Sequence, residues 1–426
     1  MGLKARLRGM GMNRQVVVLS AARMADAYCN SMLIVLLPLY VVETPRYGIF
    51  ARMPDEMLIG ILISLSGLMF ALMQPLAAWV SDRLGRRKPF ILGGLIVLAV
   101  ATLGYIPANS FSQLAALRLV QGFGIAFTIP TALALLSAYA DAGRVGTAMG
   151  VFTTARMIGF AIGPLVGGLV MTTVSFQAAF MAGAAGALVS LLFVLLYVPE
   201  VRGDDVHAPR PGARSRGREE QTETVSPERR RAVMRQVYIM GSGIYFMAVS
   251  ISLIAAVEPE LNRRLDQTAL GFGVAFAMLT VGRFLTQIPI GHISDRIGRR
   301  PLITIGMFVM IPLAVLQGFA PTTLALSAVR FLLGVASALV VAPAYALVSD
   351  LALPGRMVRQ MSVLTMAFGL GVATGPMISG LLAGVAGFEV PFIAAGVALT
   401  FGAIFVAAFV KESLPGRAEA LHHRTG

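Results

Sequence analysis

The stretch Trp79-Val-Ser-Asp-Arg-Leu-Gly-Arg-Arg-Lys88 lies between two long apolar runs, and the chain contains it twice. The second copy is His292-Ile-Ser-Asp-Arg-Ile-Gly-Arg-Arg-Pro301. Other landmarks keep the same spacing to within one residue: Gln74 and Gln287, Arg118 and Arg330, Gly122 and Gly334, and Gly163-Pro164 and Gly375-Pro376. Several landmarks in one register indicate two related halves, each with its own copy of the charged turn.

The composition indicates a membrane protein. Of 426 residues, 57% are hydrophobic and 13% charged, whereas soluble domains are usually about one quarter charged. The single cysteine, Cys29, excludes a disulfide within the chain, and no Cys/His cluster suggests a metal site. The net charge of +14 does not indicate nucleic-acid binding, because the basic residues fall between apolar runs instead of forming one patch. Without a catalytic constellation or a phosphate-binding loop, we expect neither an enzyme nor an ATP-driven pump.

Segments of about 20 apolar residues can cross a bilayer as helices. Twelve are predicted, at 15–42, 57–81, 89–107, 112–140, 146–174 and 176–198, and at 235–258, 268–294, 301–319, 323–350, 360–384 and 388–411. The expected fold is therefore an all-α membrane protein of two parallel six-helix bundles, residues 1–198 and 235–426. Residues 199–234 are rich in Arg, Glu, Gly and Pro, which predicts a flexible cytoplasmic linker.

Lysine and arginine indicate the orientation. With the N-terminus inside, the outer loops hold only Arg46, Arg52, Arg263 and Arg264, and most other basic residues outside the spans lie on the inner side. Basic loops stay in the cytoplasm, so both termini are expected there. We expect an integral protein of a bacterial cytoplasmic membrane, with the lipid bilayer and a small-molecule substrate as its partners, and a monomer.

The repeated turn resembles a loop signature of the major facilitator superfamily, Gly-x-x-x-Asp-Arg/Lys-x-Gly-Arg-Arg/Lys. The second half fits it fully, whereas Ala78 replaces the first glycine in the other half, which we expect to loosen one close helix contact. The resemblance implies a latch that holds the inner ends of the two halves together, with Arg144 as partner for Asp82 and Arg356 for Asp295. A simple topology anchor is the alternative. The expected gating residues at and beside the two turns are Asp82, Arg83, Gly85, Arg86, Arg87 and Arg144, and Gly291, Asp295, Arg299 and Arg356.

A second stretch, residues 159–168, reads Gly-Phe-Ala-Ile-Gly-Pro-Leu-Val-Gly-Gly. It resembles the antiporter signature of the superfamily, Gly-x-x-x-Gly-Pro-x-x-Gly-Gly, at every fixed position. Glycines four apart allow another helix to approach closely, and a proline bends the helix. The resemblance implies the twelve-helix drug:proton antiporter group and a bendable seam; ordinary helix packing is the alternative. The seam consists of Gly159, Gly163, Pro164, Gly167 and Gly168.

Charges inside the predicted helices are costly without a partner and indicate function. Arg23 and Asp26 are three residues apart and share a helix face with Asn30. Asp26 is the only carboxylate found in the middle of a predicted span, and it is expected either to carry a proton or to form a fixed pair with Arg23 or Arg156. Arg118, with Gln121 and Gly122, resembles the Arg-x-x-Gln-Gly signature associated with proton-driven transport, and Arg156 is a further candidate for proton coupling. Glu258, at the outer end of its helix, is the second choice as proton carrier or else is solvated.

The expected function is proton-coupled export of small amphipathic or drug-like compounds by alternating access, without a cofactor. The alternative is transport of an anionic metabolite by the intramembrane arginines, and a third possibility is a transporter-like receptor or a lipid scramblase. Polarisable and aromatic side chains suit promiscuous apolar sites. The expected substrate-cavity residues are Arg23, Asn30, Met32, Gln121, Phe127, Phe152, Phe246, Met247 and Arg283.

Overall fold

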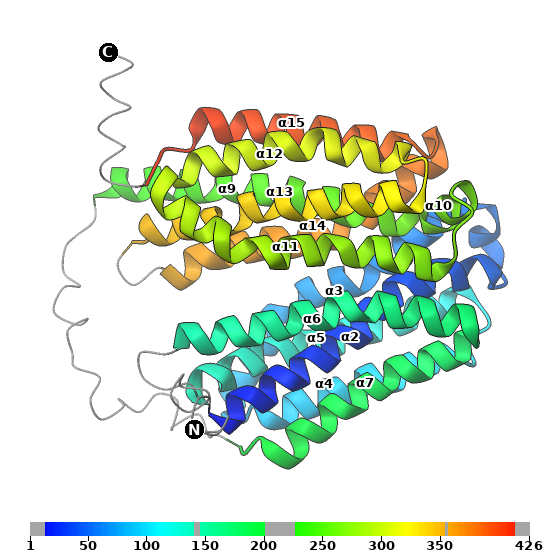
Figure 1. Cartoon of the computed structure of the whole chain (residues 1–426). Coiled ribbons are helices and arrows are strands. Elements are labelled where there is room, and N and C mark those ends of the chain that lie inside the picture. Colours follow the sequence, from blue (N-terminus) through cyan, green and yellow to red (C-terminus); the bar gives the residue numbers. More distant parts are fainter. Residues whose placement is uncertain (1–12, 140–144, 201–225, 354–356, 414–426) are drawn as a thin grey trace, which may run out of the picture. The chain divides into compact units, whose positions relative to one another are not determined.

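The computed structural model describes residues 13–139, 145–200, 226–353 and 357–413 (Figure 1). The described chain is helical. The first half holds α2 (Arg14–Glu43), a 3₁₀ turn at Gly48–Arg52, α3 (Asp55–Leu84), α4 (Lys88–Gly104), α5 (Phe111–Tyr139), α6 (Val145–Thr173) and α7 (Phe176–Tyr197). The second half holds α9 (Pro227–Ser252), a 3₁₀ turn at Leu253–Val257, α10 (Glu258–Arg264), α11 (Ala269–Ile297), α12 (Arg299–Leu316), a 3₁₀ turn at Gln317–Phe319, α13 (Thr323–Asp350), α14 (Met357–Ala386) and α15 (Val390–Phe409).

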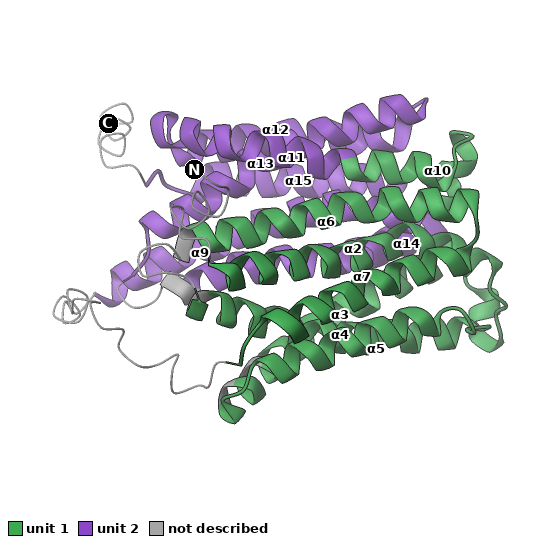
Figure 2. Ribbon diagram, turned by 60° about the horizontal axis from the view of Figure 1, so that its bottom comes forward, with its two compact units in different colours: residues 1–213, 258–277 green, residues 214–257, 278–426 purple. Residues whose placement is uncertain are grey.

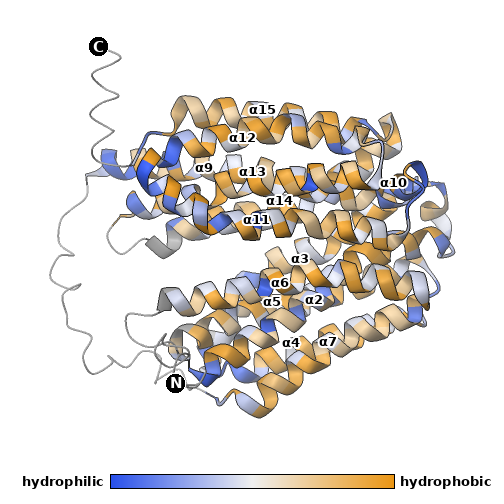
Figure 3. Cartoon of the chain, viewed as in Figure 1, coloured by the Kyte–Doolittle hydropathy of each residue, from blue (hydrophilic) through white to orange (hydrophobic). Residues whose placement is uncertain are grey.

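The twelve predicted apolar helices are all present in the described part of the chain. Eleven helical segments are long and apolar enough to cross a membrane, and the twelfth, Lys88–Gly104, is a shorter apolar helix. Figure 3 shows hydrophobic residues along the helices and hydrophilic ones mainly at helix ends and in the connections. The all-α membrane fold is thereby confirmed.

The seventh span differs most from its prediction. It runs from Pro227 to Arg264 and so extends at both ends beyond the expected 235–258. It begins early because Ser226 accepts a hydrogen bond from the Arg229 backbone N–H at 3.2 Å and Pro227 suits the first helical turn. Its α-helix tightens at Leu253–Val257, and Pro259 follows in the first turn of α10, where its missing backbone N–H removes no hydrogen bond within that helix. Most of the expected linker, residues 201–225, lies outside the described residues.

The chain forms two compact units (Figure 2). Unit 1 contains residues 1–213 and 258–277, and unit 2 contains 214–257 and 278–426. In each unit the first helix packs against the fifth, α2 against α6 and α9 against α14. The third helix likewise packs against the fourth and the sixth, α4 against α5 and α7, and α12 against α13 and α15. The same pattern in both units is what an internal duplication requires.

Repeated glycines mark equivalent close approaches within each unit. Gly122 of α5 lies against the Ser66 backbone of α3, and Gly334 of α13 lies against the Leu279 backbone of α11. A Cβ at either position would collide with the facing carbonyl oxygen. Glycine at these matched positions therefore allows the helix backbones to pack at short range.

Candidate functional site

A charged cluster lies inside unit 1 on one face of α2. Arg23 and Asp26 form an ion pair, and the Asn30 side-chain amide donates to the Asp26 carboxylate at 3.2 Å. Asp26 is 2% exposed. Arg156 of α6 also interacts electrostatically with Asp26. The predicted shared face is confirmed, and the structure holds the carboxylate with two polar neighbours on its own helix.

The glycine seam of α6 packs directly against this segment of α2. Gly159 lies against the Met24 backbone, between the positions of Arg23 and Asp26. Gly163 lies against the Tyr28 carbonyl and the Ser31 hydroxyl, and Ser31 donates to the Gly159 carbonyl at 3.4 Å. Since a Cβ at either glycine would meet backbone atoms at less than contact distance, the seam fixes how α6 lies against the charged cluster.

The other side of the seam packs against the start of α11, which belongs to unit 1. A Cβ at Gly168 would lie 2.5 Å from the Ala269 carbonyl oxygen. Gly273 in turn lies against the Pro164 carbonyl, and Phe160 and Phe276 place their ring centroids 6.2 Å apart. The antiporter signature therefore joins α6 to two helices, α2 and the first part of α11.

Glu258 is a second buried carboxyl group in unit 1, and its expected solvation is wrong. It is fully buried at the start of α10, because that helix packs against α2 and Val257 and Leu261 are buried beside it. Within the described residues neither carboxylate oxygen accepts a hydrogen bond of normal geometry, and Asn262, one turn further along, is the polar side chain that acts on it. A buried carboxyl group with so few polar neighbours is costly in a helix that spans a membrane and so indicates function.

Arg118 belongs to a buried polar network that joins three helices. Its guanidinium donates to the Leu62 and Ile63 carbonyls of α3, at 3.2 and 3.3 Å, and to the Gln121 amide oxygen at 3.2 Å. Gln121 also accepts from the Tyr105 hydroxyl at 2.8 Å. In unit 2, Arg330 donates to the Ile251 carbonyl at 2.9 Å, where α9 gives way to the 3₁₀ turn. Both arginines thus satisfy helix carbonyls inside their units.

Beyond Arg23 and Asn30, the predicted substrate-cavity residues lie in different surroundings. Gln121, Met32, Phe152 and Met247 are buried within the packing of their own units, so they have the surroundings of core residues. Phe127 is partly buried and contacts Phe90 and Phe123. Phe246 lines an apolar pocket of about 260 Å³ in unit 2, together with Tyr245 and Ser379. Arg283 places its guanidinium 5.4 Å from the ring centroid of Phe368. Contact of these residues with substrate remains a prediction.

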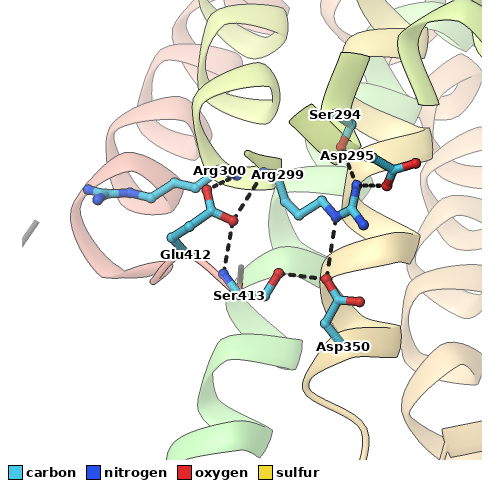
Figure 4. A network of polar contacts seen from close by, with 7 residues as sticks. All are labelled: Ser294, Asp295, Arg299, Arg300, Asp350, Glu412 and Ser413. Atoms are coloured by element: carbon cyan, nitrogen blue, oxygen red, sulfur yellow. Dashed lines mark hydrogen bonds and ion pairs between the residues drawn. The ribbon is translucent and has the colours of Figure 1, made fainter. Parts of the chain in front are cut away.

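The charged turn of unit 2 is the centre of a polar network (Figure 4). Arg299 forms an ion pair with Asp295, donates to the Ser294 hydroxyl at 3.1 Å and reaches the Asp350 carboxylate at 3.3 Å. Gly298, with φ of +114°, makes the sharp turn that brings Arg299 back to Asp295. Asp295 therefore has a partner within its own signature, while the predicted partner, Arg356, lies outside the described residues.

In each unit, a glutamate that the sequence did not single out caps the backbone N–H groups that follow the charged turn. Glu412 accepts from the backbone N–H groups of Arg299 and Arg300, both at 3.1 Å, at the start of α12 (Figure 4). Glu200 accepts from the backbone N–H groups of Arg87 and Lys88, at 2.9 and 3.3 Å, at the start of α4. A carboxylate suits these unsatisfied donors and the positive end of the helix dipole. Each glutamate follows the last long helix of its half and so connects the end of that helix to the charged turn by hydrogen bonds.

The first charged turn, in unit 1, has an exposed basic edge. Arg83 and Arg86 are exposed, and Arg83 places its guanidinium 5.3 Å from the Trp79 ring centroid. Gly85 has a φ of +60°, as the turn requires. The side chain of Asp82 and all of Arg144 lie outside the described residues. A Cβ at Gly291 would meet nothing within 4 Å, so the contact that Ala78 was expected to loosen is not seen at the matching glycine.

Glu412→Gln is expected to lower the free energy of unfolding by about 1 kcal/mol, because the two N–H groups at the start of α12 lose a charged acceptor. Thermal unfolding in detergent measures this, and the loss should shrink at high salt. Lys411→Gln is the control, since that side chain is adjacent and exposed. Equal melting temperatures for Glu412→Gln and Lys411→Gln would show that the cap does not stabilise the turn.

The fold and the buried charges define a membrane transporter built from two related helical bundles. The chain belongs to the Major Facilitator Superfamily, which it matches over residues 19–252 and 238–425. It is 23% identical over 350 residues to the multi-drug resistance efflux pump PmrA of Streptococcus pneumoniae, covering 81% of this chain and 84% of that protein. It is 25% identical over 382 residues to the multidrug resistance protein MdtG of Serratia proteamaculans, covering 88% of each.

Solved structures support the same fold. A bacterial homologue of the human lysosomal transporter Spinster, in an inward-facing and occupied conformation, superimposes with a TM-score of 0.73 at 17% identity, covering 92% of this chain and 95% of that one. The nucleoside transporter NupG gives a TM-score of 0.72 at 15% identity, covering 94% and 100%. The protein is thus an integral membrane transporter of the superfamily.

Proposed function

We propose that the protein exports small amphipathic or drug-like compounds in exchange for protons. The single observation that carries this proposal is the placement of the antiporter signature. Its glycines pack against α2 at Met24, beside the buried pair of Arg23 and Asp26. The seam that bends in alternating access therefore touches the segment that holds a titratable group.

Two carboxyl groups serve as proton sites in this proposal. Asp26 is buried beside Arg23 and Asn30, whereas Glu258 is buried beside Asn262 and, within the described residues, without an ion-pair partner. The two lie on α2 and α10, which contact each other within unit 1. A proton held at Glu258 in one conformation and at Asp26 in another would couple protonation to the movement of these helices.

The relatives named as multidrug resistance proteins, at 23% and 25% identity, support a drug-like substrate. The distribution of basic residues supports our further proposal that both ends of the chain lie in the cytoplasm. We also propose a bacterial cytoplasmic membrane, since the relatives above are bacterial, and a monomer. The proton gradient supplies the energy, and no cofactor takes part.

Uptake into inside-out membrane vesicles tests the substrate class. With an acidic interior, a lipophilic cationic dye is expected to accumulate at least about tenfold more in vesicles that contain the protein, and an equally sized organic anion is not. A protonophore should abolish the accumulation. Accumulation of the anion alone would instead support the alternative, transport of an anionic metabolite through arginines such as Arg283.

A further inference from the structure

A groove on unit 2 lies between the first turns of α9 and the last turns of α15. Its volume is about 530 Å³, and Arg231, Arg235, Tyr238 and Ser242 line it on α9, with Phe405 opposite on α15. Positions 231, 235, 238 and 242 follow one face of a helix. Arg231 and Arg235 are both exposed, and none of the lining residues is acidic. The groove therefore has a cationic end and an apolar body.

The cationic end lies level with the end of the apolar helix α15. The Arg235 guanidinium is 6.0 Å from the ring centroid of Phe409, the last residue of the apolar helix α15. The Lys411 backbone N–H donates to the Gln236 side chain at 3.1 Å, so the two helices are joined at this level. Unit 1 has the same arrangement, with Arg14 at 4.9 Å from the ring of Tyr197, the last residue of α7. Arginine beside an aromatic ring is typical of the membrane interface.

The apolar body of the groove continues onto a face of α15 that suits lipid. Phe401, Ile404 and Phe405 are 68%, 53% and 44% exposed along this face. A run of large exposed apolar side chains on a membrane-spanning helix is stable against hydrocarbon. A molecule in the groove would therefore have its charged part beside Arg231 and its apolar part among lipid chains.

We propose that this groove binds an anionic phospholipid of the leaflet at the cytoplasmic end of α9. Its phosphate contacts Arg231 and Arg235, and one acyl chain lies along Tyr238, Ser242 and Phe405. Arg229 and Arg230 outweigh Glu228 at the start of the same helix and so add to the positive potential. Basic clusters directly beside a membrane-spanning helix attract anionic lipids, each arginine contributing about a fivefold preference. A zwitterionic lipid gains less, because the groove offers no carboxylate for its cationic group.

Fluorescence quenching in vesicles tests the proposal. A Phe405→Trp substitution in a Trp79→Phe background gives the chain one tryptophan, since Trp79 is otherwise the only one. The protein is placed in zwitterionic vesicles that contain a small share of brominated phosphatidylglycerol or, separately, brominated phosphatidylcholine. Stronger quenching by the anionic lipid, at about fivefold to 30-fold lower mole fraction, is the expected result.

Two matched double variants identify the cause. Arg231→Gln/Arg235→Gln should abolish the preference for phosphatidylglycerol, whereas Arg229→Gln/Arg230→Gln should keep most of it, because those arginines do not line the groove. Both variants remove the same charge. The proposal is overturned if both brominated lipids quench equally, or if the two double variants lose the preference to the same degree.

Discussion

Gly159→Ala is expected to lower transport at least about tenfold and the melting temperature by several degrees. The added Cβ would collide with the Met24 carbonyl oxygen and would lie 2.9 Å from the Met24 carbonyl carbon. Both atoms belong to the backbone, so α6 and α2 must move apart. Overpacking of this kind costs about 1–3 kcal/mol. The displacement would occur between Arg23 and Asp26 and so would also disturb the ion pair.

Gly150→Ala is the matched control on the same helix. A Cβ at Gly150 would meet nothing within 4 Å, and alanine has a higher helix propensity than glycine. This variant should keep wild-type transport and stability. Thermal unfolding in detergent and dye uptake into inside-out vesicles measure both properties. If Gly159→Ala and Gly150→Ala behave alike, the seam does not set the position of the charged cluster.

Substitution of the two buried carboxyl groups, Asp26 and Glu258, is expected to have different effects on protein stability but the same effect on proton-coupled transport. Asp26→Asn breaks a buried ion pair and leaves Arg23 without its carboxylate, which costs about 3 kcal/mol. Glu258→Gln puts an uncharged amide of the same shape in place of a carboxyl group that has no ion pair to lose within the described residues. The free energy of unfolding is therefore expected to change by less than about 1 kcal/mol.

Both variants should lose uphill accumulation of substrate driven by the proton gradient. Glu258→Gln should still exchange substrate for substrate across the membrane, because it mimics the proton-loaded carrier. Thermal unfolding and transport in proteoliposomes, with and without an imposed gradient, separate the two effects. Glu260→Gln serves as control, since Glu260 pairs with Arg263 and Arg264 on the same short helix. Gradient-driven accumulation by Glu258→Gln would remove Glu258 from the coupling mechanism.

Much of the fold could be predicted from the sequence, because a bilayer imposes a length and a hydropathy on every crossing helix. The repeated landmarks were equally informative, since Gly122 and Gly334 occupy matched helix contacts. The shared face of Arg23, Asp26 and Asn30 followed from helical spacing alone. Residues three and four apart on a helix share a face whatever the rest of the fold, so this geometry can be predicted from the sequence.

What the sequence did not predict depends on packing between distant segments. The burial of Glu258 results from the 3₁₀ turn before α10 and from the contact of α10 with α2. Glu200 and Glu412 were missed as caps because each lies 112 or 113 residues from the N–H groups it accepts from. A signal was nevertheless present, since both glutamates follow the last helix of their half at the spacing that relates the Gly-Pro pairs.

Proton release on substrate binding tests the central claim most directly. Purified protein in weakly buffered detergent solution is mixed with a lipophilic cationic substrate, and the pH is followed with a soluble indicator. The exchange mechanism predicts that substrate displaces protons from the wild-type protein and that the release is lost in Glu258→Gln. Saturating binding of the substrate without any release of protons from the wild-type protein would contradict the mechanism.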